Sequence, residues 1–192
     1  MKFEIDGLVI EERPTGQEFY GEYVWPSALV MCDYLKRNPE IVKGKRVLEL
    51  GSGTGIVGLY AAKLGAKHVT LTDFIDWNIE AIKRNIQENH LEKVADPRWL
   101  AWGTNLHEKW DVILGSDVTY PTMDYPALLN AVHTHLVSQG RCVFAHHHRP
   151  WACGPNLNEI ETHEVSNLEV YSELVKSNCN SPKISIIEME VQ

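Results

Sequence analysis

Apolar runs alternate with amphipathic segments through the middle of the chain. Short runs rich in Val, Ile and Leu are typical of buried strands, and apolar residues every three or four positions are typical of helices packed on a sheet. The pattern predicts strands over residues 46–50, 67–72, 98–101, 110–116 and 141–145. It predicts four helices: the first starts at Pro26, and the second spans 54–64. The third carries Ile75, Ile79, Ile82 and Ile86 on one face, and the fourth carries Leu128, Leu129, Val132 and Leu136. This alternation implies a mostly parallel, doubly wound α/β sheet of the Rossmann-like class.

Hairpin patterns lie at both ends of the chain. Residues 3–12 alternate around Asp6-Gly7, and residues 168–175 and 183–191 flank a stretch rich in turn residues, which predicts a C-terminal antiparallel hairpin. A length of 192 residues suits a single domain. We expect an N-terminal hairpin and cap over 1–25, an α/β core over 26–150, and a C-terminal segment with its hairpin over 151–192.

Composition narrows the partners and the compartment. A formal charge of −8 argues against binding to phosphate backbones and favours a cationic partner. The four cysteines form no CxxC pair, so we expect free thiols and a cytosolic protein, with the nucleus as the alternative. The N-terminus lacks the apolar region of a secretory signal, and no apolar run approaches the roughly 20 residues of a membrane span.

The most specific pattern is a glycine loop. Residues 47–50 form an apolar run that contains Glu49, and Gly51, Gly53 and Gly55 follow at every second position. Such a run predicts a buried strand that turns sharply into a helix around a ligand. We infer that the ligand is the methyl donor S-adenosylmethionine. Glycines are needed because this bulky molecule must lie directly against the backbone, where a Cβ would occupy its space. Asp73, eighteen residues after the loop, closes the next apolar run, where its carboxylate can accept both ribose hydroxyls.

Two other interpretations of this loop stay open. Residues 53–58 also fit the GxGxxG fingerprint of nicotinamide or flavin dinucleotide sites. That fingerprint would start two residues too late, because Gly51 already ends the strand, so the methyl donor is favoured. The remaining interpretation is a glycine-rich turn without a ligand.

Ligands of such sheets bind outside the carboxyl ends of the strands, so the residues that follow each strand are candidates. Trp102 either covers an adenine by stacking or packs in the core. Ser116 ends the fourth strand, and 117–120 place a carboxylate and a phenol three residues apart. His146, His147 and His148 lack a carboxylate or thiolate at ligand spacing, so we predict no metal site. We expect His146, His148 or Arg149 to border a substrate pocket.

These residues together resemble the seven-strand class I methyltransferases, and within them the family-16 lysine-directed protein methyltransferases. The resemblance covers roughly residues 20 to 150 and is carried by Trp25-Pro26, the loop from Glu49 to Gly55, Asp73, Trp102-Gly103, and Asp117 with Tyr120. It implies that the donor contacts are Trp25, Glu49, Gly51, Ser52, Gly53, Asp73, Trp102 and Ser116. Two features depart from the family: Ser116 replaces a small apolar residue, and residues 151–167 lack a periodic helix.

The resemblance implies a lysine N-methyltransferase that uses S-adenosylmethionine, acts on a protein substrate by in-line displacement, and needs no metal. Asp117 would accept a hydrogen bond from the substrate amine, and the Tyr120 ring would form a wall of the channel. The alternative for this pair is that Asp117 caps the turn and Tyr120 packs in the core. A small-molecule amine or pyridine N-methyltransferase and a catalytically silent donor-binding scaffold remain as other functions.

Overall fold

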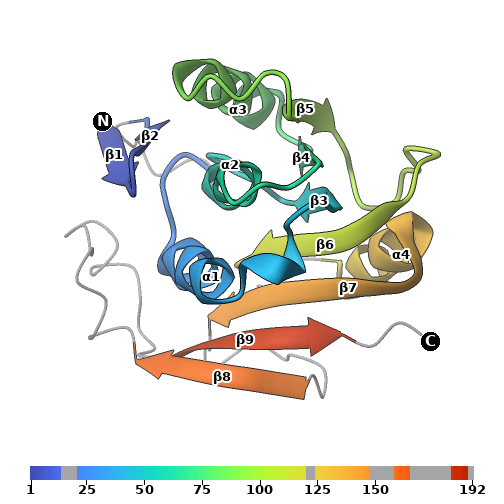
Figure 1. Ribbon diagram of the computed structural model, residues 1–192. Helices are drawn as coiled ribbons and strands as arrows, with labels where there is room; N and C mark the ends of the chain where they lie inside the picture. The colour runs from blue at the N-terminus through green and yellow to red at the C-terminus, as the bar shows by residue number, and fades with distance from the viewer. Residues whose placement is uncertain (14–20, 120–123, 148–157, 165–182, 190–192) are drawn as a thin grey trace.

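The computed structural model describes residues 1–13, 21–119, 124–147, 158–164 and 183–189. Its centre is a seven-stranded sheet in the order β5-β4-β3-β6-β7-β9-β8 (Figure 1). The strands are β3 (Arg46–Leu50), β4 (His68–Asp73), β5 (Ala95–Trp99), β6 (Trp110–Ser116), β7 (Leu136–His147), β8 (Asn158–Glu164) and β9 (Lys183–Met189). The first five are parallel, and β9 is antiparallel to both of its neighbours. The predicted Rossmann-like class with a mostly parallel sheet is confirmed.

Helices cover both faces of the sheet. They are α1 (Pro26–Arg37), α2 (Ile56–Lys63), α3 (Asp76–Glu88) and α4 (Tyr125–His135), with a short 3-10 helix η1 (Pro39–Ile41). Side chains alternate along each strand, so Val47 joins the core under α1, α2 and α3, and Leu48 joins a second core under α4. No helix among these described residues is long and apolar enough to span a membrane. Cys32 and Cys142 are free and buried, whereas Cys153 and Cys179 lie outside the described residues.

The predicted N-terminal hairpin, β1 (Lys2–Ile5) and β2 (Leu8–Glu11), lies against α3 (Figure 1). Two asparagines one helical turn apart hold it there. Val9 N–H donates to Asn89 Oδ1 at 2.8 Å, and Asn89 Nδ2 donates back to the Val9 carbonyl at 2.7 Å. Glu11 N–H donates to Asn85 Oδ1 at 2.8 Å. The two amides therefore pair with the exposed edge of β2 as a neighbouring strand would.

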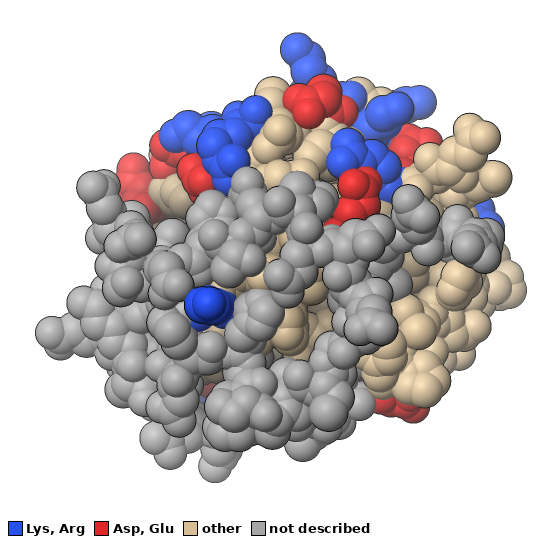
Figure 2. Space-filling view, turned by 90° about the horizontal axis from the view of Figure 1, so that it is seen from below, with Lys and Arg blue, Asp and Glu red and all other residues tan. Residues whose placement is uncertain are grey.

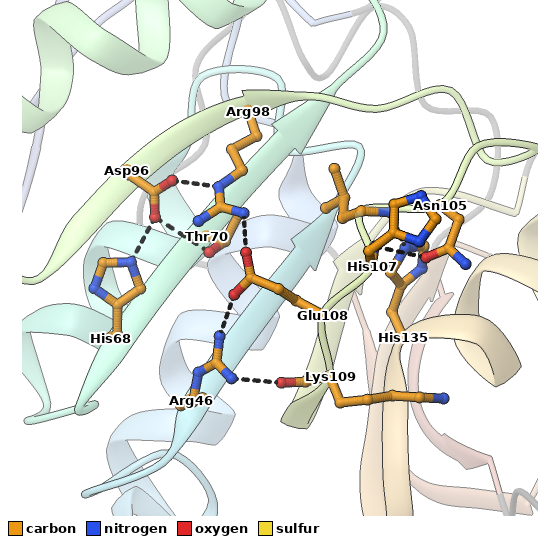
Figure 3. A network of polar contacts seen from close by, with 11 residues as sticks. Arg46, His68, Thr70, Asp96, Arg98, Asn105, His107, Glu108, Lys109 and His135 are labelled. Atoms are coloured by element: carbon orange, nitrogen blue, oxygen red, sulfur yellow. Dashed lines mark hydrogen bonds and ion pairs between the residues drawn. The ribbon is translucent and has the colours of Figure 1, made fainter.

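A polar network covers the second face of the sheet over β3, β4 and β5 (Figure 3). Glu108 joins Arg46 of β3 to Arg98 of β5 through two ion pairs of 2.6 Å each. Asp96 joins Arg98 at 2.7 Å to His68 of β4 at 2.5 Å. α4 packs on β7, and these polar side chains shield the same face of the sheet nearer its β5 edge.

Two strands start earlier than the pattern predicts. The third parallel strand, expected over 98–101, is β5, which contains Pro97. Proline suits an edge strand because the edge has no partner for its missing N–H, and β5 is the edge of the sheet. The fifth, expected over 141–145, is the longer β7, which includes Leu136, a residue that the pattern predicts in the preceding helix. A register shift opposite β6 leaves residues 137–140 as a bulge, and their turn-like composition hid the start of β7.

The antiparallel C-terminal pairing is present with a different first strand. β9 pairs with β8, which starts ten residues before the stretch expected to form the partner strand. The expected strand over 168–175 lies outside the described residues.

Candidate active site

The strand order changes direction between β3 and β6, and the residues that follow these strands meet at one edge of the sheet. β3 pairs with β4 on one side and with β6 on the other. The glycine loop therefore lies between Asp73, which ends β4, and Ser116, which ends β6. In open α/β sheets this is the position of the ligand crevice.

The glycine loop is shaped by close contacts with the rest of the chain. Gly51 has a φ of 63°, and a Cβ built on it would lie 2.9 Å from Val118 Cγ1, closer than real side chains approach. Gly53 lies against the backbone of Gly21, where an added Cβ would be 3.3 Å from the Gly21 carbonyl oxygen. Ser52 is buried and donates its N–H to the Thr72 carbonyl at 2.8 Å, which ties the loop to β4. The glycines are thus required by internal packing as well as by the expected donor.

The Asp73 carboxylate is buried, with 6% of the residue exposed. It accepts the N–H groups of Gly53 and Ile75, each at 3.0 Å. Burial raises the pKa of Asp73, and these backbone donors and the Asn78 amide oppose that rise. Asn78 is buried too, and its Oδ1 atom has no hydrogen-bond partner among the residues that the structure describes. A carboxylate with spare acceptor capacity beside an unpartnered amide oxygen fits a ligand that donates two hydroxyl groups, such as a ribose.

Glu49, expected among the donor contacts, points into the protein. It is 1% exposed, and its Oε2 accepts the N–H of Gly58 in the first turn of α2 at 3.0 Å. Burial raises the pKa of Glu49 to about 8. A Cβ on Gly58 would lie 2.7 Å from this oxygen, so the third glycine of the GxGxxG pattern serves contact between helix and strand. Any contact of Glu49 with the donor stays a prediction.

The two tryptophans expected at the donor site come from different elements. Trp25 is the N-cap residue of α1 and is partly exposed, with its ring centroid 4.6 Å from that of Tyr23. Trp102 packs partly buried against the second core, and its Cζ2 would lie 3.9 Å from a Cβ on Gly51. Trp102 therefore packs against the core, which is one of the two roles considered for it, and its indole also reaches the loop. Contact of either indole with the donor stays a prediction.

The turn after β6 has a backbone conformation that few residues adopt. Asp117 has a φ of 56°, in the left-handed region, where Asp and Asn are the side chains most easily tolerated after glycine. Its N–H donates to the Ala145 carbonyl of β7 at 2.9 Å. Val118, which follows it, is buried against Gly51. Asp117 is thus held beside the glycine loop, whereas Tyr120 lies outside the described residues.

The histidines at the end of β7 have different surroundings. His146 is buried and forms a hydrogen bond through Nδ1 with Thr119 Oγ1, so it contacts the turn after β6. His147 is fully buried at the position of β7 that pairs with Ile184 of β9. His148 and Arg149 lie outside the described residues. Within the described part of the chain, no three His, Cys, Asp or Glu side chains are grouped to hold a metal ion.

Sequence reasoning missed the asparagines of α3. Asn85 bonds to β2 and also donates to the Thr54 carbonyl of the glycine loop at 2.9 Å, and Asn78 lies beside Asp73. A signal was present, because positions 78, 82, 85 and 89 form one helical stripe. Asparagines on the same stripe as the buried Ile82 indicate polar contacts inside the protein rather than a solvated face.

Known proteins share both the fold and the sequence pattern. Protein N-lysine methyltransferase METTL21A of Danio rerio is 42% identical over 116 residues, covering 57% of this chain and 52% of that protein. Histone-arginine methyltransferase METTL23 of Rattus norvegicus is 38% identical over 121 residues, covering 59% of this chain and 53% of that protein. The chain thus spans about half the length of these relatives.

The fold also occurs in solved structures. Pyrococcus abyssi tRNA (uracil-54, C5)-methyltransferase in complex with S-adenosyl-L-homocysteine matches with a TM-score of 0.64 and 15% identity, covering 98% of this chain and 43% of that chain. The model of the lysine methyltransferase family matches residues 2–171. Because that match takes in the parallel strands, the loop and the turn that meet at the crevice, and confirms the resemblance, the chain belongs to the lysine methyltransferase family.

Proposed function

We propose that this protein is an S-adenosylmethionine-dependent N-methyltransferase that methylates a lysine side chain of a protein substrate. One observation carries the proposal. Asp117, in its left-handed turn, precedes Val118, which packs directly on Gly51 of the glycine loop. The carboxylate expected to meet the substrate amine and the loop expected to hold the donor are therefore in adjoining, mutually fixed segments.

When bound, S-adenosylmethionine supplies an electrophilic methyl group. Asp73 and Asn78 would accept the ribose hydroxyls, and the backbone of Gly51 and Gly53 would lie along the donor. The bound S-adenosyl-L-homocysteine of the Pyrococcus abyssi neighbour and membership of the family support this choice of donor. Asn78 Oδ1, which has no partner within the described ranges of the chain, supports it independently, because a buried acceptor of this kind is normally satisfied.

The nucleophile must be a neutral amine, yet lysine has a pKa of about 10.4, so roughly one side chain in 10³ is neutral near pH 7. A carboxylate beside an ammonium raises the pKa of the amine and therefore opposes deprotonation. Asp117 thus acts as a docking charge and hydrogen-bond acceptor that orients the amine, rather than as a general base. The advantage of a fixed turn is orientation, since holding the reacting groups in line lowers the barrier substantially.

Charge supports a protein substrate over a nucleic acid. The chain carries a formal charge of −8, which attracts a lysine-bearing segment and repels phosphate. Figure 2 shows Lys and Arg interspersed with Asp and Glu along the upper rim of the face seen from below. Mixed signs of this kind do not form the basic stripe that phosphate binding uses. The buried free thiols Cys32 and Cys142 support the cytosol as the compartment.

The test is methyl transfer from labelled S-adenosylmethionine to a protein extract, followed by hydrolysis and amino-acid analysis. We expect methyllysine with the wild-type enzyme and its loss with Asp117→Asn. Asn tolerates the left-handed backbone, so this variant removes the charge and keeps the turn. Asp124→Ala, which removes an exposed carboxylate that caps α4, is the matched control and should retain activity.

Other results would contradict the proposal in distinct ways. Methylarginine would favour a second candidate, arginine methylation, which the similarity to the rat histone-arginine methyltransferase suggests. Label confined to small molecules would indicate a small-molecule N-methyltransferase. Donor binding without any transfer would indicate a silent scaffold.

A further inference from the structure

Two buried polar side chains pair where β6 and β7 end. One hydrogen bond joins Thr119 Oγ1 to His146 Nδ1, and the two residues are only 5% and 6% exposed. Thr119 follows Asp117 by two residues, and His146 follows Ala145, whose carbonyl accepts the Asp117 N–H. The end of β7 therefore holds the turn at two successive positions, once through its backbone and once through a side chain.

The residue between these two anchors is fixed from the opposite side. A Cβ added to Gly51 would lie only 2.9 Å from Val118 Cγ1, and a Cβ added to Gly115 would lie 3.0 Å from Val118 Cγ2. Both neighbours are glycines, so Val118 fits closely between the glycine loop and β6. Asp117, Val118 and Thr119 are thus each held by a different contact. A left-handed non-glycine residue persists where its surroundings over-determine the backbone in this way.

We propose that His146 and Thr119 form a positioning pair that aims the Asp117 carboxylate at the substrate amine. The inference rests on the proposed function and adds to it residues that act through the turn rather than on the substrate. A hydrogen bond has a defined length and direction, whereas an apolar contact allows sliding. The pair therefore fixes the height of the turn above the glycine loop, and with it the distance from carboxylate to methyl group.

The chemistry of buried pairs provides a test that separates positioning from stability. Removing one partner deprives a buried polar atom of the other of this hydrogen bond, which destabilises the fold, whereas replacing both by apolar groups of similar shape costs less. The variants are therefore Thr119→Val, His146→Leu, and the double variant that contains both changes. His146→Asn is the conservative variant, because its amide can reach Thr119 from a similar position.

Both single variants should unfold at lower urea concentration, and the double variant should regain most of the wild-type midpoint. We expect kcat with labelled donor and protein extract to stay about 10-fold or more below wild type in the double variant, because small misplacements of a reacting group slow transfer strongly. His146→Asn should recover kcat to within about 3-fold of wild type, and donor affinity by calorimetry should change less than about 3-fold in every variant. A double variant that recovers activity together with stability would show that the pair is merely structural.

Amide hydrogen exchange tests the same inference without turnover. Exchange at residues 117–119 should be about 10-fold faster in Thr119→Val than in wild type, while exchange at Gly58, on the other side of the glycine loop, should rise no more than the measured loss of global stability accounts for. Unaltered exchange at 117–119 overturns the inference. If the wild-type enzyme transfers no methyl group, the proposed function fails, yet the exchange measurement still decides whether the pair holds the turn.

Discussion

Replacing Glu49 by Gln should remove a large part of the pH dependence of this protein's stability. The carboxyl group is 1% exposed and accepts the Gly58 N–H at 3.0 Å, and burial raises its pKa from an ordinary 4.5 to about 8. Near pH 7 the side chain is therefore protonated in the folded protein and ionised in the unfolded chain. The folded state binds a proton that unfolding releases.

The sign and the size follow from this difference in proton binding. Because the folded pKa is the higher one, the contribution of Glu49 to stability is fully present below pH 4.5 and is lost as the pH rises through about 8. Between those values the free energy of unfolding should fall by about 1.4 kcal/mol for each pH unit, on the order of 5 kcal/mol in all. Such a loss is comparable with the whole stability of many domains.

Urea denaturation of the wild type and of Glu49→Gln from pH 5 to pH 9 measures the effect. Gln is neutral at every pH and keeps an acceptor for Gly58, so it imitates the protonated acid. We expect similar stabilities at pH 5 and a more stable variant at pH 8. Glu80→Gln, which changes an exposed glutamate of α3, should leave the wild-type profile unaltered. Parallel profiles for the wild type and Glu49→Gln would refute the reasoning.

Three further changes test the packing and the division of roles. Gly58→Ala should lower the free energy of unfolding by about 1–3 kcal/mol in urea denaturation, because its Cβ would approach two buried side chains within 2.7 Å. Gly103→Ala, where an added Cβ meets open space, should be neutral, and equal effects of the two changes would contradict the packing argument. Asn85→Ala should lower the free energy of unfolding by roughly 1–3 kcal/mol and speed amide exchange in β2, and unchanged exchange there would show that the hairpin docks by other contacts. Asp73→Ala should abolish donor binding in calorimetry, while Asp117→Asn should leave it largely intact; equal losses would contradict the assignment of Asp117.

The parts of the fold that the sequence predicts well are those with locally encoded patterns. The strands at Arg46–Leu50 and Trp110–Ser116 have the predicted bounds, because each contains a short apolar run flanked by glycine or polar residues. β5 was misplaced because Pro97 indicates a break, and only the strand order shows that it lies on an edge where proline is tolerated. Strand order depends on pairing between distant segments, which a local pattern does not contain.

The same limit applies to the site. The glycine loop and Asp73 could be recognised because their spacing is a property of one β-α-β segment. The partners that hold them are distant in the chain: Val118 packs on Gly51, and His146 bonds to Thr119 across 27 positions. Glu49 shows the same limit, since its place in the motif suggests a ligand contact but does not reveal that the fold turns it inward onto α2.

The glycine loop is held from two sides by segments that lie outside it. Asn85 of α3 joins the Thr54 carbonyl to the backbone of β2, so the N-terminal hairpin and the loop share one amide. On the other side Val118 brings the turn after β6 against Gly51. A displacement of the loop would strain both attachments, because neither a buried amide nor a close glycine contact can stretch without losing its partner. Donor binding and amine orientation would therefore depend on the same short piece of backbone. Because the hairpin helps to hold that backbone through Asn85, it belongs to the machinery that we propose, although it is remote from the reacting groups.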